Sequence, residues 1–310
     1  MELRVGLKFK FTKIVLLLLN ESYENVMKKT IIADSGSTKT DWRLQDDGDN
    51  VEKIITPGIN PYFMDAAEIT TMLKNNWNEQ VPAQTIDKVF FYGAGCSSKT
   101  KCEIVSKGMS DFFKNAEIKV YHDLLAAARS LFEDEEGIAG ILGTGSNSCL
   151  YVNGQIWEEL FSLGYMFGDH GSGAQIGKNI VDAFLKDQLP DYVRNRFIET
   201  YQYSKEELLD HIYNRPNPNR FLAGFSEFAS KNMDSAFIHQ IVKNCFSDYF
   251  KYQISKYSNY KNYRIRFVGS VAYYFRDVLE TVAAEYGMKV DLVIKNPVEN
   301  LLAYHKKHNA

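Results

Sequence analysis

The sequence is poor in cysteine, with four among 310 residues: Cys96, Cys102, Cys149 and Cys245. No two of them form a C-x-x-C pair, and none has a zinc-like spacing with the six histidines. Neither a disulfide framework nor a zinc-bound fold is therefore indicated. We expect reduced thiols, as in cytoplasmic proteins.

An excess of one charge and long apolar runs are also missing. The formal net charge is only -3, so no global basic field indicates a nucleic-acid partner. No stretch reaches the roughly 18 apolar residues of a membrane span. Because 45% of the 310 residues are hydrophobic, the chain can bury a substantial core and form two domains. We expect a cytoplasmic protein without nucleic-acid or membrane partners, and we leave homodimerisation open.

Residues 1–26 stand apart from the rest of the sequence. Four basic residues precede an apolar run at 14–19, as in a secretion signal, but the run is short and no small-x-small cleavage site follows. Met27 leads directly into the first predicted strand. We therefore expect translation to start at Met27 and residues 1–26 to be an extension outside the fold.

The strongest chemical signal is TIIADSGSTKTDWRL at residues 30–44. An apolar strand ends at Asp34, a tight turn of small residues follows, and a second strand returns. Gly36 lets the backbone approach a ligand, while Thr38 and Lys39 add hydrogen-bond donors for phosphate oxygens. The carboxylate of Asp34 can hold Mg²⁺ through water. Taken alone, the stretch is more often an ordinary hairpin with a polar turn.

The same module occurs a second time. Residues 137–142 form an apolar strand, GTGSN at 143–147 is a small-residue turn, and 148–152 is the returning strand. Asn153-Gly154 is a strong hairpin signal before a third strand at 155–160. Strands at 88–92 and 118–121, separated by helical stretches, complete the first half. The repeat predicts a duplicated α/β fold with a cleft between the halves.

Three further sites follow the strands. Asp123 falls between the strand at 118–121 and a helix, where it can be a general base or a helix N-cap. Asp169 lies in GDHGSG at 168–173, before a long helix that Asp169 or Ser172 could cap and whose positive end could face an anion. Gly269-Ser270 joins a strand at 266–268 to a helix at 271–286 and allows close backbone approach.

The order of these motifs resembles the sugar kinase, actin and heat-shock chaperone ATPase superfamily. More narrowly, the chain is similar to the BadF/BadG/BcrA/BcrD-type ATPase family and its N-acetylglucosamine kinase-like branch, from about residue 29 to the C-terminus. The resemblance implies an α/β fold of two ribonuclease-H-like (actin-like) domains with a nucleotide cleft between them. We place them at 27–132 and 133–310, with a helical insertion in the second and a last helix that packs back on the first.

The resemblance also implies a function: an ATP-dependent phosphotransferase that phosphorylates a hydroxyl of N-acetylglucosamine or a related amino sugar, with ATP and Mg²⁺ as cofactors. It makes Asp123 the catalytic base and Asp34 the metal ligand. The residues implied for ATP are Gly36, Ser37, Thr38, Lys39, Gly143, Thr144, Gly145, Ser146, Gly269 and Ser270. Those implied for the sugar are Asn60, Asp123, Thr144, Gly145 and Asp169.

Other functions are compatible with the same motifs. One branch of the family comprises ATPase activators of 2-hydroxyacyl-CoA dehydratases, in which a [4Fe-4S] cluster bridges two subunits. These need two suitably placed cysteines per chain and typically a second motif like DIGGQD, where this chain has GTGSN. A nucleotide-sensing protein without turnover would keep every motif. Residues 162–165, SLGY, also differ from the Gly-Trp-Gly-His-like segment common in the kinases, so the sugar is not fixed.

Removing residues 1–26 tests the predicted start site. A chain that begins at Met27 is expected to keep the melting temperature and activity of the full chain, because no helix or strand pattern connects the extension to the duplicated core. Thermal unfolding of both forms measures this. A clear loss of stability in the shorter chain would refute the prediction.

Overall fold

The computed structural model describes residues 29–36, 38–46 and 51–309, so the predicted extension at 1–26 and Ser37 lie outside it. The chain divides into two compact units, Met1–Val120 (unit 1) and Tyr121–Ala310 (unit 2). This division lies before the predicted boundary at residue 132. The reason is helix α4 (Asp123–Phe132), which packs on the strands of unit 2.

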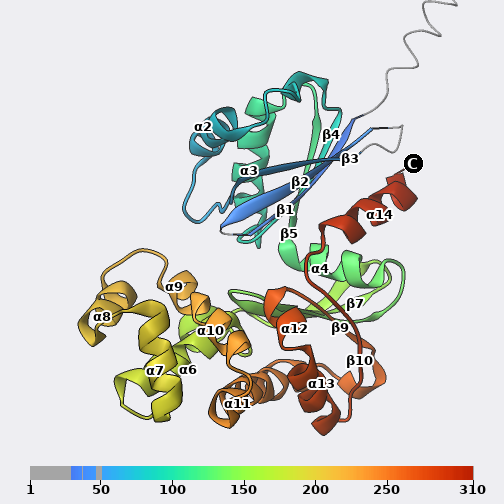
Figure 1. The fold of residues 1–310 in the computed structure, drawn as a ribbon. Coiled ribbons are helices and arrows are strands. Elements are labelled where there is room, and N and C mark those ends of the chain that lie inside the picture. Colours follow the sequence, from blue (N-terminus) through green and yellow to red (C-terminus); the bar gives the residue numbers. More distant parts are fainter. Residues whose placement is uncertain (1–28, 37, 47–50, 310) are drawn as a thin grey trace, which may run out of the picture. The chain divides into compact units, whose positions relative to one another are not determined.

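Unit 1 is built on a five-stranded sheet of order β3-β2-β1-β4-β5 (Figure 1). Its strands are β1 (Thr30–Ser35), β2 (Lys39–Gln45), β3 (Val51–Pro57), β4 (Lys88–Gly93) and β5 (Glu117–His122). The first three are antiparallel neighbours, and β1 pairs with β4 in parallel. The predicted strand-turn-strand module at 30–44 is therefore confirmed, and β3 adds a third antiparallel strand to it.

Helices α2 (Ala66–Asn76) and α3 (Lys99–Phe112) pack on one face of this sheet, and a short turn of helix, η1 (Ala83–Thr85), precedes β4. Trp42 of β2 lies at the centre of the core and is completely buried. Its ring is 5.3 Å from that of Trp77, and its indole N–H donates to Thr56 Oγ1 at 2.9 Å. The buried ring thus has both apolar contacts and a partner for its polar atom.

Unit 2 repeats this sheet. Its order is β10-β9-β6-β7-β8, which, read from the β8 edge, matches the order in unit 1 strand for strand. The strands are β6 (Gly137–Leu142), β7 (Ser146–Val152), β8 (Gln155–Glu159), β9 (Ile265–Val268) and β10 (Val290–Ile294). Here too the first three are antiparallel and β6 pairs with β9 in parallel. The duplication predicted from the two hairpin turns is confirmed.

Helices cover both faces of the second sheet. Helix α4 packs on one face, and α14 packs on α4, while α6 and α11 to α13 contribute to the core on the other face. The helices after β8 are α5 (Gly164–Phe167), α6 (Gly173–Leu185), α7 (Asp191–Tyr201), α8 (Lys205–Tyr213), α9 (Pro218–Gly224), α10 (Ser226–Lys231), α11 (Ala236–Tyr252), η2 (Ile254–Lys256), η3 (Tyr260–Asn262), α12 (Ser270–Tyr274), α13 (Arg276–Glu285) and α14 (Val298–Asn309).

The prediction of a single helix at 271–286 is wrong, because the structure has two helices there, α12 and α13. Phe275 has the non-helical angles φ -112° and ψ 28° and separates α12 from α13. Its side chain is buried in the core of unit 2, 6.4 Å from the ring of Phe246. Tertiary packing of Phe275 thus accompanies a break that the helical periodicity did not reveal.

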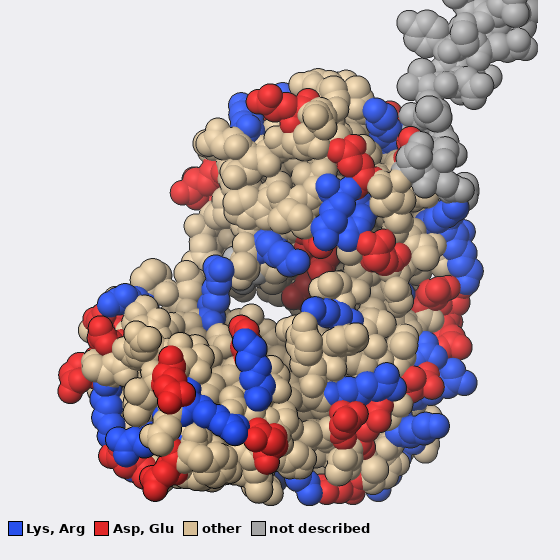
Figure 2. Space-filling model, viewed as in Figure 1, with Lys and Arg blue, Asp and Glu red and all other residues tan. Residues whose placement is uncertain are grey.

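Charges of both signs are interspersed on the face shown in Figure 2. In the part of the chain that the structure describes, no helix is long and apolar enough to cross a membrane. Both observations agree with the balanced composition.

Truncation of Trp42 tests the core of unit 1. Trp42→Ala is expected to lower the free energy of unfolding by about 3–5 kcal/mol, because it leaves a large cavity. Denaturant unfolding measures this loss. Trp157→Ala, at a position 74% exposed, is the matched control and should change stability by about 0.5 kcal/mol or less. Equal losses would contradict the assigned core.

Candidate functional site

The first predicted phosphate turn lies between β1 and β2 in unit 1. Ser35, at the end of β1, stabilises the turn through its hydroxyl. Its Oγ lies 2.8 Å from Thr40 Oγ1 and accepts a hydrogen bond from Ile59 N–H at 3.0 Å. Gly36 N–H donates to Lys39 O at 3.1 Å. A Cβ added at Gly36 would meet only that oxygen, 4.0 Å away. The turn therefore has an open backbone surface that a ligand could approach.

Asp34 is half-buried in β1, directly opposite Asp41 of β2 in the strand register. Sequence reasoning missed Asp41. Its carboxylate forms an ion pair with Arg43 and lies 3.8 Å from the ammonium groups of Lys39 and Lys53. Because Lys39 and Asp41 lie two residues apart in β2, their side chains are on the same face of the strand. Pairing TIIADS against the returning strand in register could have found Asp41.

Asn60 lies in a turn of unit 1 after β3. Its Oδ1 accepts from Tyr62 N–H at 3.0 Å, and its carbonyl accepts from Phe63 N–H at 3.0 Å. The loop after β4 adjoins this turn, because a Cβ added at Gly95 would lie 2.6 Å from Asn60 Oδ1. Asn60 thus has a structural role in its own turn, and sugar contact stays a prediction.

The second predicted phosphate turn, residues 143–146, joins β6 to β7 in unit 2. Gly143 N–H donates to Gly145 O at 3.0 Å within the turn. The first residues of α6 bind it from outside: Gly173 N–H donates to Gly143 O at 2.8 Å, and Ala174 N–H donates to Thr144 O at 3.1 Å. The start of α6 and the turn therefore form one unit of structure.

Asp169 contacts this turn with its side chain. Its Oδ1 accepts from Ser146 N–H at 3.2 Å, and a Cβ added at Gly145 would lie 3.1 Å from Oδ2. Burial raises the pKa of Asp169, although the Ser146 hydrogen bond and His170 oppose that shift. Ser172, and not Asp169, caps α6, since its Oγ accepts from Gln175 N–H at 3.2 Å. The structure thus brings Asp169 together with Gly145 and Ser146.

The third turn, Gly269-Ser270 between β9 and α12, touches the second. Gly269 has φ +126°, which L side chains rarely adopt, and an added Cβ would clash with the carbonyl of Leu142 and lie 3.3 Å from Gly143 N. Because β6 and β9 are parallel, their carboxyl ends meet at the same edge of the sheet. The turns at 143–146, 169–173 and 269–270 therefore converge at one edge of unit 2. We call this cluster the three-turn site.

The three-turn site has features that suit a phosphate group. A Cβ added at Gly143 would have no neighbour within 4 Å, so backbone is exposed there. Ser146 Oγ is buried without a hydrogen-bond partner among the described residues. The positive end of α6, a helix of 13 residues, abuts the turn. Open space at the turn, an unpartnered hydroxyl and the positive end of a helix together can bind an anion.

Asp123 is the first residue of α4, after β5. It is not the N-cap, a position that His122 holds without a side-chain capping bond. Asp123 Oδ1 lies 3.2 Å from His122 Nε2, and 31% of the Asp123 side chain is exposed. The carboxylate is therefore placed beside a histidine and reachable by solvent. Its catalytic role stays a prediction.

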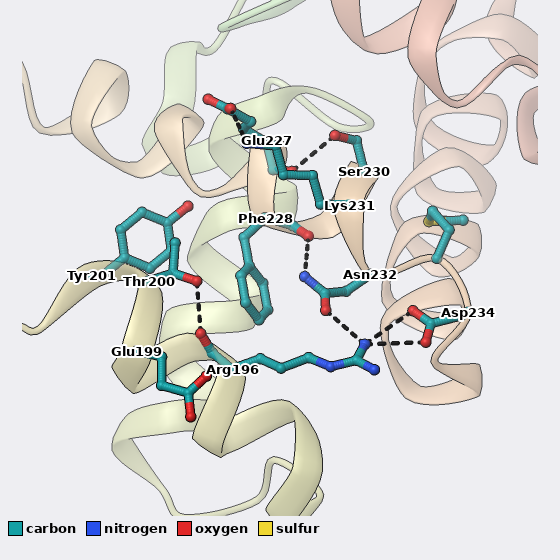
Figure 3. Close-up of a pocket in the computed structure, with 11 residues that line it drawn as sticks. Arg196, Glu199, Thr200, Tyr201, Glu227, Phe228, Ser230, Lys231, Asn232 and Asp234 are labelled. Carbon is teal, nitrogen blue, oxygen red and sulfur yellow. Dashed lines mark hydrogen bonds and ion pairs between the residues drawn. The ribbon is translucent and has the colours of Figure 1, made fainter.

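A pocket of about 720 Å³ lies elsewhere in unit 2, between α7, α10 and the loop after α10 (Figure 3). Its charged groups bind one another. Arg196 Nη1 donates to Asn232 Oδ1 at 2.9 Å and to Asp234 at 3.1 Å, and Lys231 pairs with Glu227 at 2.6 Å. None of the predicted site residues lines this pocket.

The cysteines are poor candidates for metal ligands. Cys96, Cys149 and Cys245 are buried, and burial raises the pKa of Cys245 to about 12 and that of Cys149 further. Burial also raises the pKa of the partly exposed Cys102. Ligation requires the thiolate, which these shifts disfavour. Within residues 29–36, 38–46 and 51–309, no cluster of three or more His, Cys, Asp or Glu side chains could hold a metal ion.

Among the solved structures that this chain resembles are two that match nearly all of it. A Porphyromonas gingivalis protein named as a "putative N-acetylglucosamine kinase" is 37% identical, with a TM-score of 0.87, over 91% of this chain and 100% of its own. A Chromobacterium violaceum protein with the same name is 14% identical, with a TM-score of 0.65, over 90% and 99%. No protein-family model and no curated protein matches. The predicted fold of two ribonuclease-H-like (actin-like) domains is confirmed.

The raised pKa of Asp169 has a consequence for stability. A carboxyl with a raised pKa binds its proton more tightly in the folded chain, so its stabilising contribution is lost as pH rises through that pKa. Asp169→Asn keeps an oxygen to accept from Ser146 N–H. We expect this variant to melt at a higher temperature than wild type at about pH 7, and the difference to shrink toward about pH 4.

Thermal unfolding across this pH range measures the difference. Asp182→Asn, at an exposed helix position, is the control and should give no such rise. A melting temperature of Asp169→Asn no higher than wild type at neutral pH would contradict the assignment of Asp169 as a partly buried carboxyl with a raised pKa.

Proposed function

The chain belongs to the BadF/BadG/BcrA/BcrD-type ATPase family, in its N-acetylglucosamine kinase-like branch, and we propose that it is an ATP-dependent sugar kinase. The observation that carries the proposal is the three-turn site, where Asp169 touches a phosphate-type turn that α6 and Gly269 hold in place. The 37% identity to a protein named as a "putative N-acetylglucosamine kinase" supports the same reaction. We propose N-acetylglucosamine or a related amino sugar as the acceptor.

Phosphoryl transfer needs positioned phosphates, a metal ion and a base that orients the acceptor hydroxyl. For ATP, the open space beside Gly143 would admit a phosphate group, and the unpartnered hydroxyl of Ser146 would donate to it in unit 2. Gly269 and Ser270 would face the adenosine. In unit 1, the exposed Thr38 and Lys39 beside the open backbone of Gly36 would add further donors.

A magnesium ion would neutralise charge on the phosphates when bound. Asp34 fits this ion because it is half-buried near the end of β1, one residue before Ser35, after which the phosphate turn begins. Mg²⁺ retains several of its waters in protein sites, so one carboxylate acting through water is sufficient. We assign Asp34 this role.

The residues that we assign to the sugar are Asp169, Thr144 and Gly145 of unit 2 and Asn60 of unit 1. Asp123 would accept the proton of the attacking hydroxyl. The nearby Nε2 of His122, 3.2 Å from Asp123 Oδ1, can hold the carboxylate in one orientation. In this arrangement each predicted carboxylate has a separate task.

A substrate panel tests the proposal. Purified chain is incubated with ATP, Mg²⁺ and individual amino sugars and hexoses, and the phosphorylated sugar is identified by mass spectrometry. We expect ATP consumption to be stimulated by N-acetylglucosamine or a close relative. ATP turnover that no sugar stimulates, together with an iron–sulfur chromophore in a reconstituted dimer, would favour a dehydratase activator. Nucleotide binding without turnover would favour a sensor.

Replacement of Asp123 tests the base. Asp123→Asn is expected to lower kcat about 100- to 10,000-fold while ATP affinity barely changes, because a general base acts on the chemical step. Steady-state kinetics and calorimetric ATP binding measure the two effects. Asp191→Asn is a matched control, since Asp191 is also the first residue of a helix. Near-normal turnover by Asp123→Asn would move the search for the base to Asp169.

Replacement of Asp34 tests the metal site. Asp34→Asn is expected to raise the Mg²⁺ concentration for half-maximal turnover about 10-fold or more, because it removes a carboxylate near the ion. Titration of activity with Mg²⁺ measures this shift. The assignment fails if Asp34→Asn and Asp123→Asn both lose nucleotide binding alike, since the carboxylates would then be maintaining the fold.

A further inference from the structure

Helix α11 contacts the three-turn site through the buried side chain of Tyr249. Tyr249 is completely buried, and its hydroxyl donates to the carbonyl of Asn147 at 2.9 Å. Asn147 directly follows Ser146, so this hydrogen bond fixes the end of the 143–146 turn at the start of β7. The sequence alone does not reveal this contact, because the two residues lie 102 positions apart.

Two glycines leave room for this tyrosine. A Cβ added at Gly140 of β6 would lie 2.8 Å from the Tyr249 hydroxyl, closer than real Cβ contacts. A Cβ added at Gly171, which has φ +75°, would lie 2.9 Å from Tyr249 Cβ. Tyr249 therefore packs closely against both the strand that leads into the 143–146 turn and the loop that carries Asp169.

The preceding residue, Asp248, reaches the same loop through a second side chain. Asp248 Oδ2 accepts from Gln175 Nε2 at 2.9 Å, and Gln175 Oε1 accepts from Gly171 N–H at 2.6 Å. The hydrogen bond to Asp248 fixes which end of the Gln175 amide faces the loop. The polar groups of these consecutive residues thus reach different parts of the site: the Tyr249 hydroxyl bonds at the end of the 143–146 turn, and Asp248 bonds through Gln175 to the Asp169 loop.

We propose that Asp248 and Tyr249 are positioning residues, which hold the Asp169 loop and the 143–146 turn in the geometry that binds sugar and nucleotide. The inference rests on the proposed function, because it assigns each contact to one substrate. Through its hydroxyl, Tyr249 positions the end of the 143–146 turn at Ser146, which we assign to ATP. Asp248, acting through Gln175, positions the loop that faces the sugar.

The hydroxyl of Tyr249 is the informative group, because packing alone would be served by phenylalanine. The neighbouring Phe250 and Phe267 are buried in the same cluster, 6.1 Å from the Tyr249 ring, without any polar atom. Burial raises the pKa of Tyr249 well above its ordinary value, so the hydroxyl stays protonated and remains a donor to Asn147. The hydrogen bond therefore persists throughout the working pH range.

Tyr249→Phe tests the nucleotide half. It removes one hydroxyl and keeps the ring, and we expect ATP to bind about 3- to 10-fold more weakly while sugar affinity is unchanged. Calorimetric titration with ATP and with sugar measures both affinities. Tyr257→Phe is the matched control, since this buried phenol lies 2.9 Å from the Ser148 hydroxyl of the same strand but does not contact the turn. It should lose thermal stability and keep ATP affinity.

Gln175→Ala tests the sugar half and remains informative if Tyr249→Phe does not fold. It removes the link between Asp248 and Gly171, and alanine suits the helix. We expect weaker sugar binding, by about 3- to 10-fold, and unchanged ATP affinity. Gln240→Ala, at an exposed position of α11 where the amide bonds only to Asn244, is the control and should leave both affinities unchanged.

The two variants are thus expected to weaken different ligands, which distinguishes a positioning role from a role in stability alone. If the variants melt at lower temperatures but bind ATP and sugar like wild type, Tyr249 and Asp248 are only core and surface contacts, and the inference is overturned. Equal weakening of both ligands in each variant would also overturn it. Failure of the wild-type chain to bind ATP or sugar would instead refute the proposed function.

Discussion

The close contact of backbone with backbone at the carboxyl ends of β6 and β9 is the constraint on which the three-turn site depends. Gly269 can press against the carbonyl of Leu142 only because it lacks a side chain and adopts φ +126°. On the other side, Gly173 N–H binds Gly143 O at 2.8 Å. The 143–146 turn is therefore held between α12 and α6, and its backbone has little freedom to move.

The two units use the same topology with different supports. In unit 1, the turn after β1 is held by the Ser35 hydroxyl, which bonds to Thr40 and to the backbone of Ile59, and by backbone hydrogen bonds within the turn and from the loop after β3. In unit 2, helix α6 holds the corresponding turn through backbone hydrogen bonds. A helix N-terminus adds a positive potential that a side-chain support lacks. Duplication has thus produced two phosphate-type turns with different electrostatic surroundings.

The strands were largely predictable from local patterns. GIAGIL, an uninterrupted apolar run bounded by turn residues, predicts β6 with the bounds that the structure gives, Gly137–Leu142. The repeated strand-turn-strand module likewise predicts the matching strand orders. These features depend on neighbours along the chain, which a single sequence shows directly.

Features set by distant residues were not predictable. Asp169 adopts φ 50° and turns its carboxylate to Ser146 instead of capping α6, because a partner 23 residues away binds it. The position of Asp41 opposite Asp34 follows only from the strand register, and the role of Tyr249 follows only from its contact with a residue 102 positions away. The break at Phe275 accompanies packing against Phe246, which lies on another helix. In each case tertiary contacts determine what local propensity leaves open.

Hydrogen exchange with and without ATP tests the central claim most directly, namely that nucleotide binds at the three-turn site of unit 2. Local protection reports which backbone N–H groups a ligand covers or orders. We predict slower exchange at residues 143–146, 169–174 and 269–270 when ATP is added, and no change around the pocket that Arg196 and Asp234 line. Protection confined to that pocket, with unchanged exchange at the three turns, would contradict the account.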